Sequence, residues 1–246
     1  MNNRKKLFII SDIHGFYTEM KAALDNAGFC ENDDGHLLIC CGDYFDRGKE
    51  NRKVFEYLEK VNNKILIRGN HEDVLSYILE SGLFHPKIYI SNASETLKEF
   101  FGEDCLDEKE ETVSFSADPD VRQRLLCHIR SCVNYYETEK YIFTHGWLPF
   151  EENDGKLFIL KNPSSASDEQ WHIARKTKWT DAYNLSDRPS KTLVCGHYPT
   201  FYANTVDSRR KGDDSSVYCG KGLIAIDAGT DTSKRVNVLV LKDSIL

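Results

Sequence analysis

Short runs of aliphatic and β-branched residues recur along the chain and predict β-strands. They lie at residues 7–10, 37–41, 64–67, 141–143, 192–195, 223–226 and 236–241. Between the first three runs, residues 16–27 and 51–61 carry apolar side chains at the spacing of amphipathic helices. Alternating strands and helices are typical of a parallel sheet, so the predicted fold class is α/β, or α+β by some schemes. Only residues 227–235 separate the last two runs, which predicts a hairpin at the end of a mixed sheet.

Residues 85–137 interrupt this alternation and are predicted to form a helical and acidic cap within a single domain spanning residues 1–246. Six carboxylates gather around Lys109 in residues 103–111. We interpret them as a solvated surface, with a partner-binding patch as the alternative. Residues 118–136 have the apolar spacing of a helix. A second polar stretch, residues 207–216, is predicted to be a loop, for which contact with the substrate is the alternative.

The charge balance and the cysteines narrow the class of protein. The 246 residues include 32 Lys and Arg against 39 Asp and Glu, a formal net charge of −7, which argues against nucleic acid or an anionic membrane as partners. No apolar run approaches the ~20 residues that span a bilayer, and the first run is too short for a signal peptide. The expected location is therefore cytoplasmic. The eight cysteines form no Cys-x-x-Cys pair and are expected to be reduced and packed as small apolar side chains.

Polar clusters that contain glycine follow five of the predicted strands. They read Ser-Asp-Ile-His-Gly at 11–15, Gly-Asp-Tyr-Phe-Asp-Arg-Gly at 42–48, Gly-Asn-His-Glu at 69–72, His-Gly at 145–146 and Gly-His at 196–197. Open α/β sheets place their functional sites outside the carboxyl ends of the strands. We therefore expect these clusters to converge on one site.

The side chains in these clusters offer nitrogen and oxygen ligands for metal ions. Asp12 and His14 are two residues apart, so on an extended backbone both point to one face and can share an ion. The carboxylate of Asp43 has two oxygens and can bridge two ions. The remaining donors are the amide of Asn70 and the imidazoles of His145 and His197. A donor set without thiolate favours a pair of divalent ions, manganese first, with iron or zinc as alternatives.

Three further residues in these clusters have the chemistry of catalysts. Arg47 carries a planar guanidinium that matches a phosphate in bidentate fashion. His71, as an imidazolium, can protonate a leaving oxygen. Asp46 is suited to orient His71 and to raise its pKa. Two metal ions about 3.5–4 Å apart can ionise a bridging water and hold a phosphoryl group for in-line attack, so the set as a whole predicts phosphoester hydrolysis.

The ordered blocks Asp-x-His-Gly, Gly-Asp-x-x-Asp-Arg-Gly and Gly-Asn-His-Glu resemble those of the calcineurin-like metallophosphoesterases, and more narrowly of the phosphoprotein phosphatase branch. That branch includes bacterial serine/threonine phosphatases and symmetrical dinucleoside tetraphosphatases. The resemblance implies a four-layer sandwich of two mixed β-sheets flanked by helices. Pro199 stands where the wider group often carries another histidine, which favours the phosphatase branch over nucleases and cyclic phosphodiesterases.

The same resemblance implies a role for each site residue. One ion would be bound by Asp12, His14 and Asp43, and the second by Asp43, Asn70, His145 and His197. Arg47 would hold phosphate, His71 and Asp46 would form the acid, and a hydroxide bridging the two metal ions would attack the phosphorus in line. The family's second phosphate-binding arginine has no clear motif in this chain, and Arg175 and Arg188 are the candidates.

The activity implied by the resemblance is hydrolysis of phosphoric monoesters by an enzyme of the serine/threonine protein phosphatase type. A symmetrical dinucleoside tetraphosphatase or a small-molecule phosphatase is the alternative. The expected partner is a phosphorylated protein or a small phosphorylated molecule, and no regulatory subunit is inferred. A non-catalytic scaffold would be expected to have lost a ligand or the acid, whereas this chain retains all of them.

Overall fold

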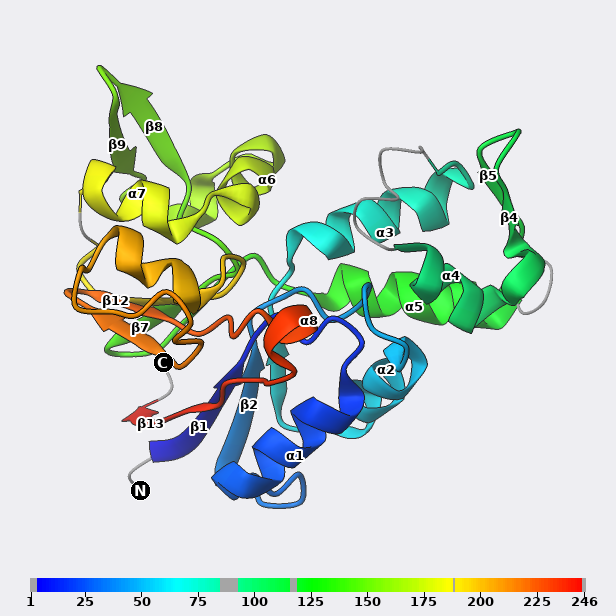
Figure 1. The fold of residues 1–246 in the computed structure, drawn as a ribbon, viewed down its shortest axis with the longest axis horizontal. Helices are drawn as coiled ribbons and strands as arrows, with labels where there is room; N and C mark the ends of the chain where they lie inside the picture. Colours follow the sequence, from blue (N-terminus) through cyan, green and yellow to red (C-terminus); the bar gives the residue numbers. More distant parts are fainter. Residues whose placement is uncertain (1–3, 85–92, 116–118, 188, 245–246) are drawn as a thin grey trace.

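The computed structural model describes residues 4–84, 93–115, 119–187 and 189–244, and two mixed β-sheets form its centre (Figure 1). In the first sheet β1 (Arg4–Ile10), β2 (His36–Cys40) and β3 (Lys64–Leu66) are parallel neighbours. The edge strand β13 (Leu239–Ser244) runs antiparallel to β1. The sheet order is therefore β13-β1-β2-β3, in which the parallel strands all present their carboxyl ends at one edge.

The second sheet has the order β11-β12-β10-β7-β6. Its inner strands β12 (Leu223–Ala225), β10 (Thr192–Cys195) and β7 (Tyr141–Phe143) are parallel. The edge strands β11 (Tyr218–Gly220) and β6 (Tyr136–Glu137) are antiparallel to their neighbours. The predicted hairpin between the last two apolar runs is wrong, because β12 and β13 belong to different sheets and the short helix α8 (Thr230–Ser233) lies between them.

Helices cover the outer face of each sheet. On the first sheet lie α1 (Tyr17–Ala27), α2 (Asn51–Lys60) and α3 (Asn70–Ser81); on the second lie α6 (Asp168–Lys176) and α7 (Trp179–Leu185). Alternate residues of β1 explain the layering: Phe8 and Ile10 pack toward the helices, whereas Leu7 and Ile9 pack between the sheets with side chains of the second sheet. The four-layer sandwich of two mixed sheets and flanking helices is confirmed.

Of residues 85–137, Tyr136–Glu137 belong to the second sheet as β6. The described part up to Ser131 lies beside α2 and α3, on the right of Figure 1. It contains α4 (Ala93–Phe101), the 3₁₀ turn η2 (Glu103–Cys105), the short strands β4 (Leu106–Asp107) and β5 (Thr112–Val113), and α5 (Pro119–Ser131). Apolar side chains of α4 and α5 join the core formed by the first three helices. The acidic residues 103–111 are mostly exposed, as expected of a solvated surface. The predicted helix at 118–136 is shorter, since α5 ends at Ser131.

The remaining elements were not expected from the sequence pattern. They are the hairpin β8 (Phe150–Asn153) and β9 (Lys156–Ile159), the turn η3 (Pro163–Ser165) and the turn η4 (Thr200–Thr205). Residues 207–216 contain neither helix nor strand, and Arg210 holds this loop through the carbonyl oxygens of Asp214 and Ser216. All eight cysteines are free. Within the described ranges, none of the helices has the length and apolar character needed to cross a bilayer.

Candidate active site

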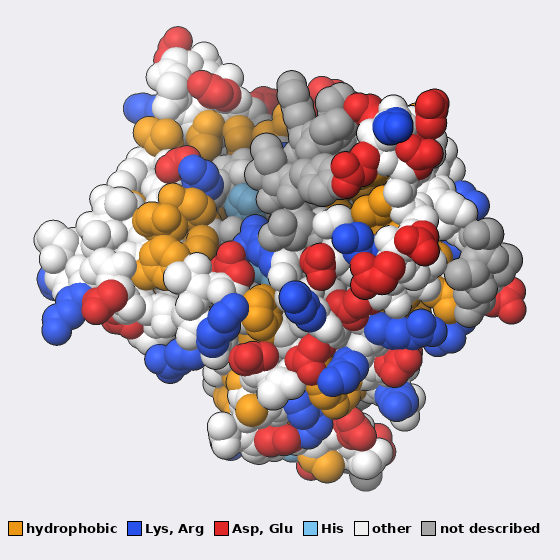
Figure 2. Space-filling view, turned by 45° about the vertical axis from the view of Figure 1, so that its right-hand side comes forward, with side chains coloured by type: hydrophobic (Ala, Val, Ile, Leu, Met, Phe, Trp, Pro, Cys, Tyr) orange, Lys and Arg blue, Asp and Glu red, His pale blue; other side chains and the backbone are white. Residues whose placement is uncertain are grey.

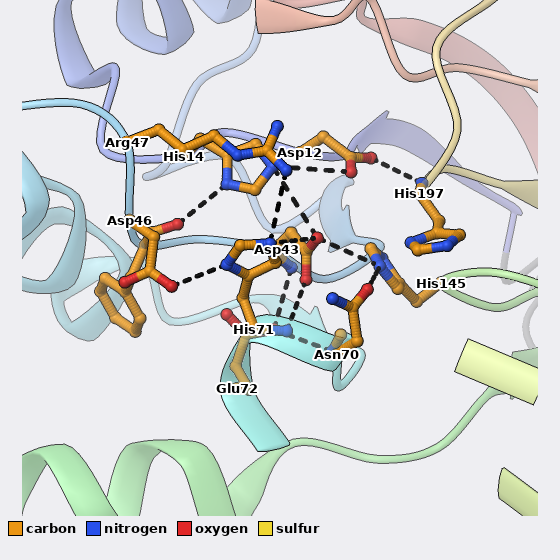
Figure 3. A network of polar contacts seen from close by, with 12 residues as sticks. Asp12, His14, Asp43, Asp46, Arg47, Asn70, His71, Glu72, His145 and His197 are labelled. Atoms are coloured by element: carbon orange, nitrogen blue, oxygen red, sulfur yellow. Dashed lines mark hydrogen bonds and ion pairs between the residues drawn. The ribbon is translucent and has the colours of Figure 1, made fainter. Parts of the chain in front are cut away.

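The predicted ligand residues converge where strands of both sheets end (Figure 3). Asp12 and His14 follow β1, Asp43 follows β2, and Asn70 is the first residue of α3. His145 and His197 follow β7 and β10 of the other sheet. The site therefore lies at the seam between the two sheets, and each side chain reaches it from a loop that a strand holds in place.

The backbone of these loops is unusual. Six residues of the site other than glycine have positive φ angles between 49° and 75°: Asp12, His14, Asp43, Asp46, Arg47 and His197. Such angles cost of order 1–3 kcal/mol each and cluster where function requires them. Gly196 permits a close approach in the same region, since a Cβ atom there would lie 2.2 Å from Asp12 Oδ2. The loops are thus folded to bring ligand side chains together at the expense of local backbone energy.

The carboxylate of Asp43 is at the centre of the cluster. Its Oδ2 lies 3.3 Å from His145 Nε2 and 3.8 Å from the Nε2 atoms of both His14 and His71. The carboxylate is buried. Burial disfavours its ionised form, but His145 and His71 outweigh burial and hold the pKa of Asp43 well below its usual value. Asp43 is therefore a buried anion that faces donors on two sides.

Two groups of donors share Asp43. His14, Asp43 and His71 form one, and Asp43, His145 and His197 the other; within each, the potential ligand atoms lie within 4.8 Å of one another. Asp12 Oδ1 lies 4.0 Å from His14 Nε2, and Asn70 Oδ1 lies 3.0 Å from His145 Nε2. Atoms that bind one ion at about 2.1 Å are themselves about 3–4 Å apart, so these separations fit a pair of divalent ions.

Hydrogen bonds to the backbone fix the orientation of the histidine rings. His14 Nδ1 lies 2.9 Å from the carbonyl oxygen of Phe45, and His145 Nδ1 lies 2.7 Å from that of Cys41, so both rings turn Nε2 toward Asp43. His197 instead directs Nε2 to the carbonyl oxygen of Lys176, 3.1 Å away, which leaves Nδ1 for the site. Burial lowers the pKa of His14 well below its usual value and that of His197 to about 4. Burial alone would lower the pKa of His145 as well, but Asp43 raises it to about 10. Neutral imidazole is the form that binds metal, so a bound ion would take the place of the His145 proton.

His71 and Asp46 form a buried pair beside this cluster. His71 Nδ1 lies 2.7 Å from Asp46 Oδ2, so Nε2 points toward Asp43. Burial alone would lower the pKa of His71, but Asp43 and the hydrogen-bonded Asp46 raise it to about 9. His71 is close enough to Asp43 to count among the potential metal ligands. The hydrogen bond between its Nδ1 and the carboxylate of Asp46 also suits a proton donor. The guanidinium of Arg47 lies next to it, with Nη2 3.4 Å from His71 Nε2.

Thr96 of α4 holds the second oxygen of Asp46. Its Oγ1 donates to Asp46 Oδ1 over 2.6 Å and accepts the backbone N–H of Asp46 over 3.0 Å. Thr96 is fully buried. This contact joins the region at 85–137 directly to the His71–Asp46 pair, and nothing in the local sequence around Thr96 pointed to it.

Glu72 organises the loops around the cluster. Its carboxylate accepts the backbone N–H groups of Gly69, Asp43 and Tyr44 at 2.8–2.9 Å, and the residue is fully buried. Burial and the neighbouring Asp43 raise the pKa of Glu72 to about 7. The motif at 69–72 contains this residue, but no local pattern assigns it to the support of the Asp43 loop.

The arginine candidates separate in the structure. Arg47 lies against the cluster, half-exposed, with Nη1 3.7 Å from Asp231 Oδ2. Arg175 is buried, and its guanidinium is bound by both carboxylate oxygens of Asp73 and by Asn134. Its side chain thus links α6 to α3. Arg188 lies outside the described residues.

In the space-filling view, histidine shows as small pale-blue areas near the centre of the face, beside Lys or Arg side chains (Figure 2).

Comparison with known proteins identifies a family and several relatives to which the chain is similar. The calcineurin-like phosphoesterase family matches residues 5–225. A symmetrical bis(5'-nucleosyl)-tetraphosphatase of Buchnera aphidicola is 40% identical over 67 residues, which are 27% of this chain and 24% of that protein. Serine/threonine-protein phosphatase 2 of Salmonella typhimurium is 39% identical over 70 residues, 28% of this chain and 30% of that protein. The chain thus matches less than a third of the length of these curated relatives.

The fold also resembles a solved structure over nearly its whole length. A protein serine/threonine phosphatase from Saccharomyces cerevisiae superposes with a TM-score of 0.56 and 14% sequence identity, covering 98% of this chain and 80% of that one. At this identity the likeness concerns the fold alone.

Proposed function

The chain belongs to the calcineurin-like phosphoesterase family, and from this premise we propose that it is a metal-dependent phosphoester hydrolase. The observation that carries the proposal is the position of Asp43, whose carboxylate lies between two groups of nitrogen and oxygen donors. The proposed ligands are Asp12, His14, Asp43, Asn70, His145 and His197. A chain that used this fold only as a scaffold would have no need for so many buried, mutually oriented donors.

The donor set suits two divalent ions of the hard or borderline class. It contains carboxylates, an amide and imidazoles but no thiolate, and we propose manganese, with iron or zinc as alternatives. When bound, such a pair supplies a hydroxide nucleophile at neutral pH and neutralises charge on the phosphoryl oxygens.

The chain's own side chains supply the remaining chemistry. Arg47 binds the phosphoryl oxygens through its planar guanidinium. In its protonated form His71 carries a proton on Nε2, the nitrogen that faces Asp43, and transfers it to the leaving oxygen as the bond to phosphorus breaks. Asp46 keeps the His71 ring in position through Nδ1 and stabilises its protonated form. We therefore assign binding to Arg47 and acid catalysis to the His71–Asp46 pair.

Two substrate classes fit this site. A phosphoserine or phosphothreonine side chain of a protein is the one that the sequence motifs favour. A dinucleoside tetraphosphate is the second, because curated relatives with that named activity match the chain. Both reactions use the same ligands, the same arginine and the same acid. The substrates differ in the leaving group and in the attacked phosphoryl group, which is terminal in a phosphomonoester and carries the rest of a nucleotide in a dinucleoside tetraphosphate.

Initial rates with Mn²⁺ test the proposal. Wild-type protein is expected to hydrolyse p-nitrophenyl phosphate only when Mn²⁺ is supplied, whereas Asp43→Asn, which removes the shared carboxylate, should abolish turnover. Asp34→Asn, an exposed carboxylate in the turn before β2 and so at the opposite end of this strand from Asp43, is the matched control. Full activity in Asp43→Asn would overturn the two-metal proposal. Parallel rates on a phosphoserine peptide and on diadenosine tetraphosphate would rank the two substrate classes.

A further inference from the structure

A pocket of about 450 Å³ lies immediately beyond Arg47. The loop from β1 to α1, the loop from β2 to α2 and the residue after α8 form its walls, which include Phe16, Thr18, Arg47, Lys49, Glu50 and Lys234. Figure 1 shows α8 next to the loop that leads into α1, and Lys234 Nζ lies 4.3 Å from the centre of the Phe16 ring. The pocket therefore joins elements from both ends of the chain and shares one residue with the proposed phosphate site.

The pocket lies on the side of the site from which a leaving group would depart. In Figure 3, Arg47, His71 and Asp46 lie on the side opposite His145 and His197. A leaving oxygen that takes its proton from His71 Nε2 is necessarily close to Arg47, because Arg47 Nη2 is only 3.4 Å from that nitrogen. Whatever is attached to this oxygen then continues past Arg47, and the pocket is the space that Arg47 borders there.

Positive charge dominates the walls once the ion pairs are taken into account. Glu50 is already bound by Lys53 Nζ at 2.8 Å and by the backbone N–H of Thr18 at 2.9 Å, so its charge is compensated. Within the ranges that the structure describes, neither Lys49 nor Lys234 forms an ion pair with a carboxylate.

Two other carboxylates lie near these cations. Glu19 lines the pocket, and Asp231 lies 3.7 Å from Arg47 with both side chains partly exposed, a contact that solvent weakens. Three cations against these two anions leave the pocket positive in a chain whose formal net charge is −7.

We propose that this basic pocket binds an anionic leaving group, the phosphate chain of a nucleotide, so that the bond cleaved is a phosphoanhydride. The inference rests on the proposed function and selects between its two substrate classes. The hydroxyl side chain of serine or threonine brings no charge to Lys49 and Lys234, whereas a second phosphate pairs with both.

The step balances as a hydrolysis. The attacking water loses one proton to solvent as its oxygen forms a bond to the attacked phosphorus, and the bond from that phosphorus to the bridging oxygen breaks. The bridging oxygen leaves with the next phosphate, keeps the electron pair of the broken bond and takes the proton of His71 Nε2. Each product carries a terminal phosphate, and the leaving nucleotide remains opposite Lys49 and Lys234 until it dissociates.

A double variant tests the pocket without touching the proposed ligands or the acid. Lys49→Ala/Lys234→Asn removes both unpaired charges; asparagine is used because Lys234 has a φ of 53°, which asparagine tolerates. The matched control, Lys156→Ala/Lys221→Ala, removes two exposed lysines from β9 and from the turn before β12. The kcat/KM for diadenosine tetraphosphate should fall at least about tenfold in the pocket variant, since charge-assisted contacts to phosphate are among the strongest hydrogen bonds.

The other substrates separate the possible outcomes. With p-nitrophenyl phosphate and a phosphoserine peptide, the pocket variant should stay within about twofold of wild type, and inhibition by inorganic phosphate should not change because Arg47 is intact. An equal fall on all three substrates, or an unchanged rate on the tetraphosphate, would overturn the pocket proposal. Wild-type turnover of p-nitrophenyl phosphate without turnover of the tetraphosphate would overturn it too, while leaving the proposed function in place.

Binding of ADP, measured by calorimetry, tests the pocket even if no substrate is turned over. We expect ADP to bind wild type and the Lys156→Ala/Lys221→Ala control alike and to bind the pocket variant at least about tenfold more weakly. Equal affinity for all three proteins would count against the pocket. Absence of turnover on every substrate, with this difference in ADP affinity preserved, would instead refute the proposed hydrolysis and retain the binding site.

Discussion

At the scale of single residues, the direction of each ring nitrogen separates a proposed ligand from a proposed acid. The rings of His14 and His145 donate Nδ1–H to backbone carbonyl oxygens, which turns Nε2 of each toward Asp43 as a proposed metal ligand. His71 gives Nδ1 to the carboxylate of Asp46, which favours its protonated form. The same residue type at neighbouring strand ends thus takes different roles because the partner of the second nitrogen differs.

The acid role of His71 predicts a dependence on the leaving group. His71→Asn should lower kcat for an alkyl phosphate by roughly 10²–10⁴, the usual range for loss of a general acid. The loss should be much smaller for p-nitrophenyl phosphate, because its leaving group departs without a proton. The measurement is kcat over a series of leaving groups, with His36→Asn, at the far end of β2, as the control. Equal losses across the series would contradict acid catalysis.

Thr96, which is fifty residues from Asp46 in sequence but in contact with it, is predicted to position the His71–Asp46 pair. Thr96→Val removes the donor to Asp46 Oδ1 while keeping the shape of the side chain. Because a hydrogen bond to a charged group contributes about 1.5–3 kcal/mol, we expect kcat for alkyl phosphates to fall about tenfold or more with little change in KM. Thr96→Ser should restore the rate.

The leaving-group series distinguishes positioning by Thr96 from a purely structural role. If Thr96 acts through Asp46, the loss in Thr96→Val shrinks for p-nitrophenyl phosphate, as for His71→Asn. A loss of the same size for every leaving group, accompanied by a lower melting temperature, would mean that the variant only loosens the packing of α4.

At the scale of elements, local periodicity located the parallel strands of both sheets but not their partners. β7 and β10 coincide with the apolar runs at 141–143 and 192–195, because short buried strands are rich in aliphatic residues. Yet β13 pairs with β1, more than 200 residues away in sequence, and this pairing has no signature in the run itself. The start of α3 was also hidden, since residues 69–72 read as a loop motif although Asn70 already begins the helix.

For the same reason, the sequence pattern did not predict the tertiary contacts of the site. Asp43, His145 and His197 were recognisable because each follows a predicted strand and adjoins glycine. Thr96 and Asp73 carry no such mark, and their importance depends on which helix packs beside α3 and the Asp46 loop. A residue's partner across the fold is a property of the packing, which a one-dimensional pattern does not contain.

Asp73 is predicted to tie α3 to α6. Its carboxylate binds Arg175 through both oxygens at 2.9 and 3.1 Å, Arg68 at 2.6 Å and His172 at 2.9 Å. Asp73→Asn leaves the guanidinium of Arg175 buried without its anion, which should cost about 3 kcal/mol of the free energy of unfolding. We expect a melting temperature lower by about 6–12 °C. Glu169→Gln, an exposed carboxylate of α6, is the control and should change little.

The pH dependence of stability provides a second measurement on Asp73. Burial raises the pKa of this carboxyl, but Arg175 and His172 outweigh burial and lower it. A carboxyl with a lowered pKa in the folded state stabilises the fold fully above its unfolded pKa of about 4, and the stabilisation is lost as the pH falls below that value. Wild type and Asp73→Asn should therefore differ most near neutral pH and converge in acid. A difference that stays constant down to pH 2 would contradict the ion pair.

At the scale of the whole molecule, the two sheets meet at a site whose folding is energetically unfavourable unless cations compensate its buried carboxylates. Asp12 and Asp43 are buried carboxylates, and the loops that carry them hold left-handed backbone conformations. Desolvating such anions is unfavourable unless cations compensate them. The protein should therefore be more stable when divalent ions are present, because ions that bind only the folded state shift the folding equilibrium toward it.

Thermal unfolding with and without Mn²⁺ tests this linkage independently of activity. At a free ion concentration about 100 times the dissociation constant, binding at one site adds about 2.7 kcal/mol, which for a chain of this length raises the melting temperature by roughly 5–10 °C. Removal of metal by a chelator should reverse the rise. Asp43→Asn should lose most of it, since the shared carboxylate belongs to both groups of donors, whereas Asp34→Asn should keep it. An equal rise in the melting temperature of Asp43→Asn would mean that the stabilising ions bind elsewhere on the protein. The stability of the site between the two sheets would then not depend on the proposed metal ions.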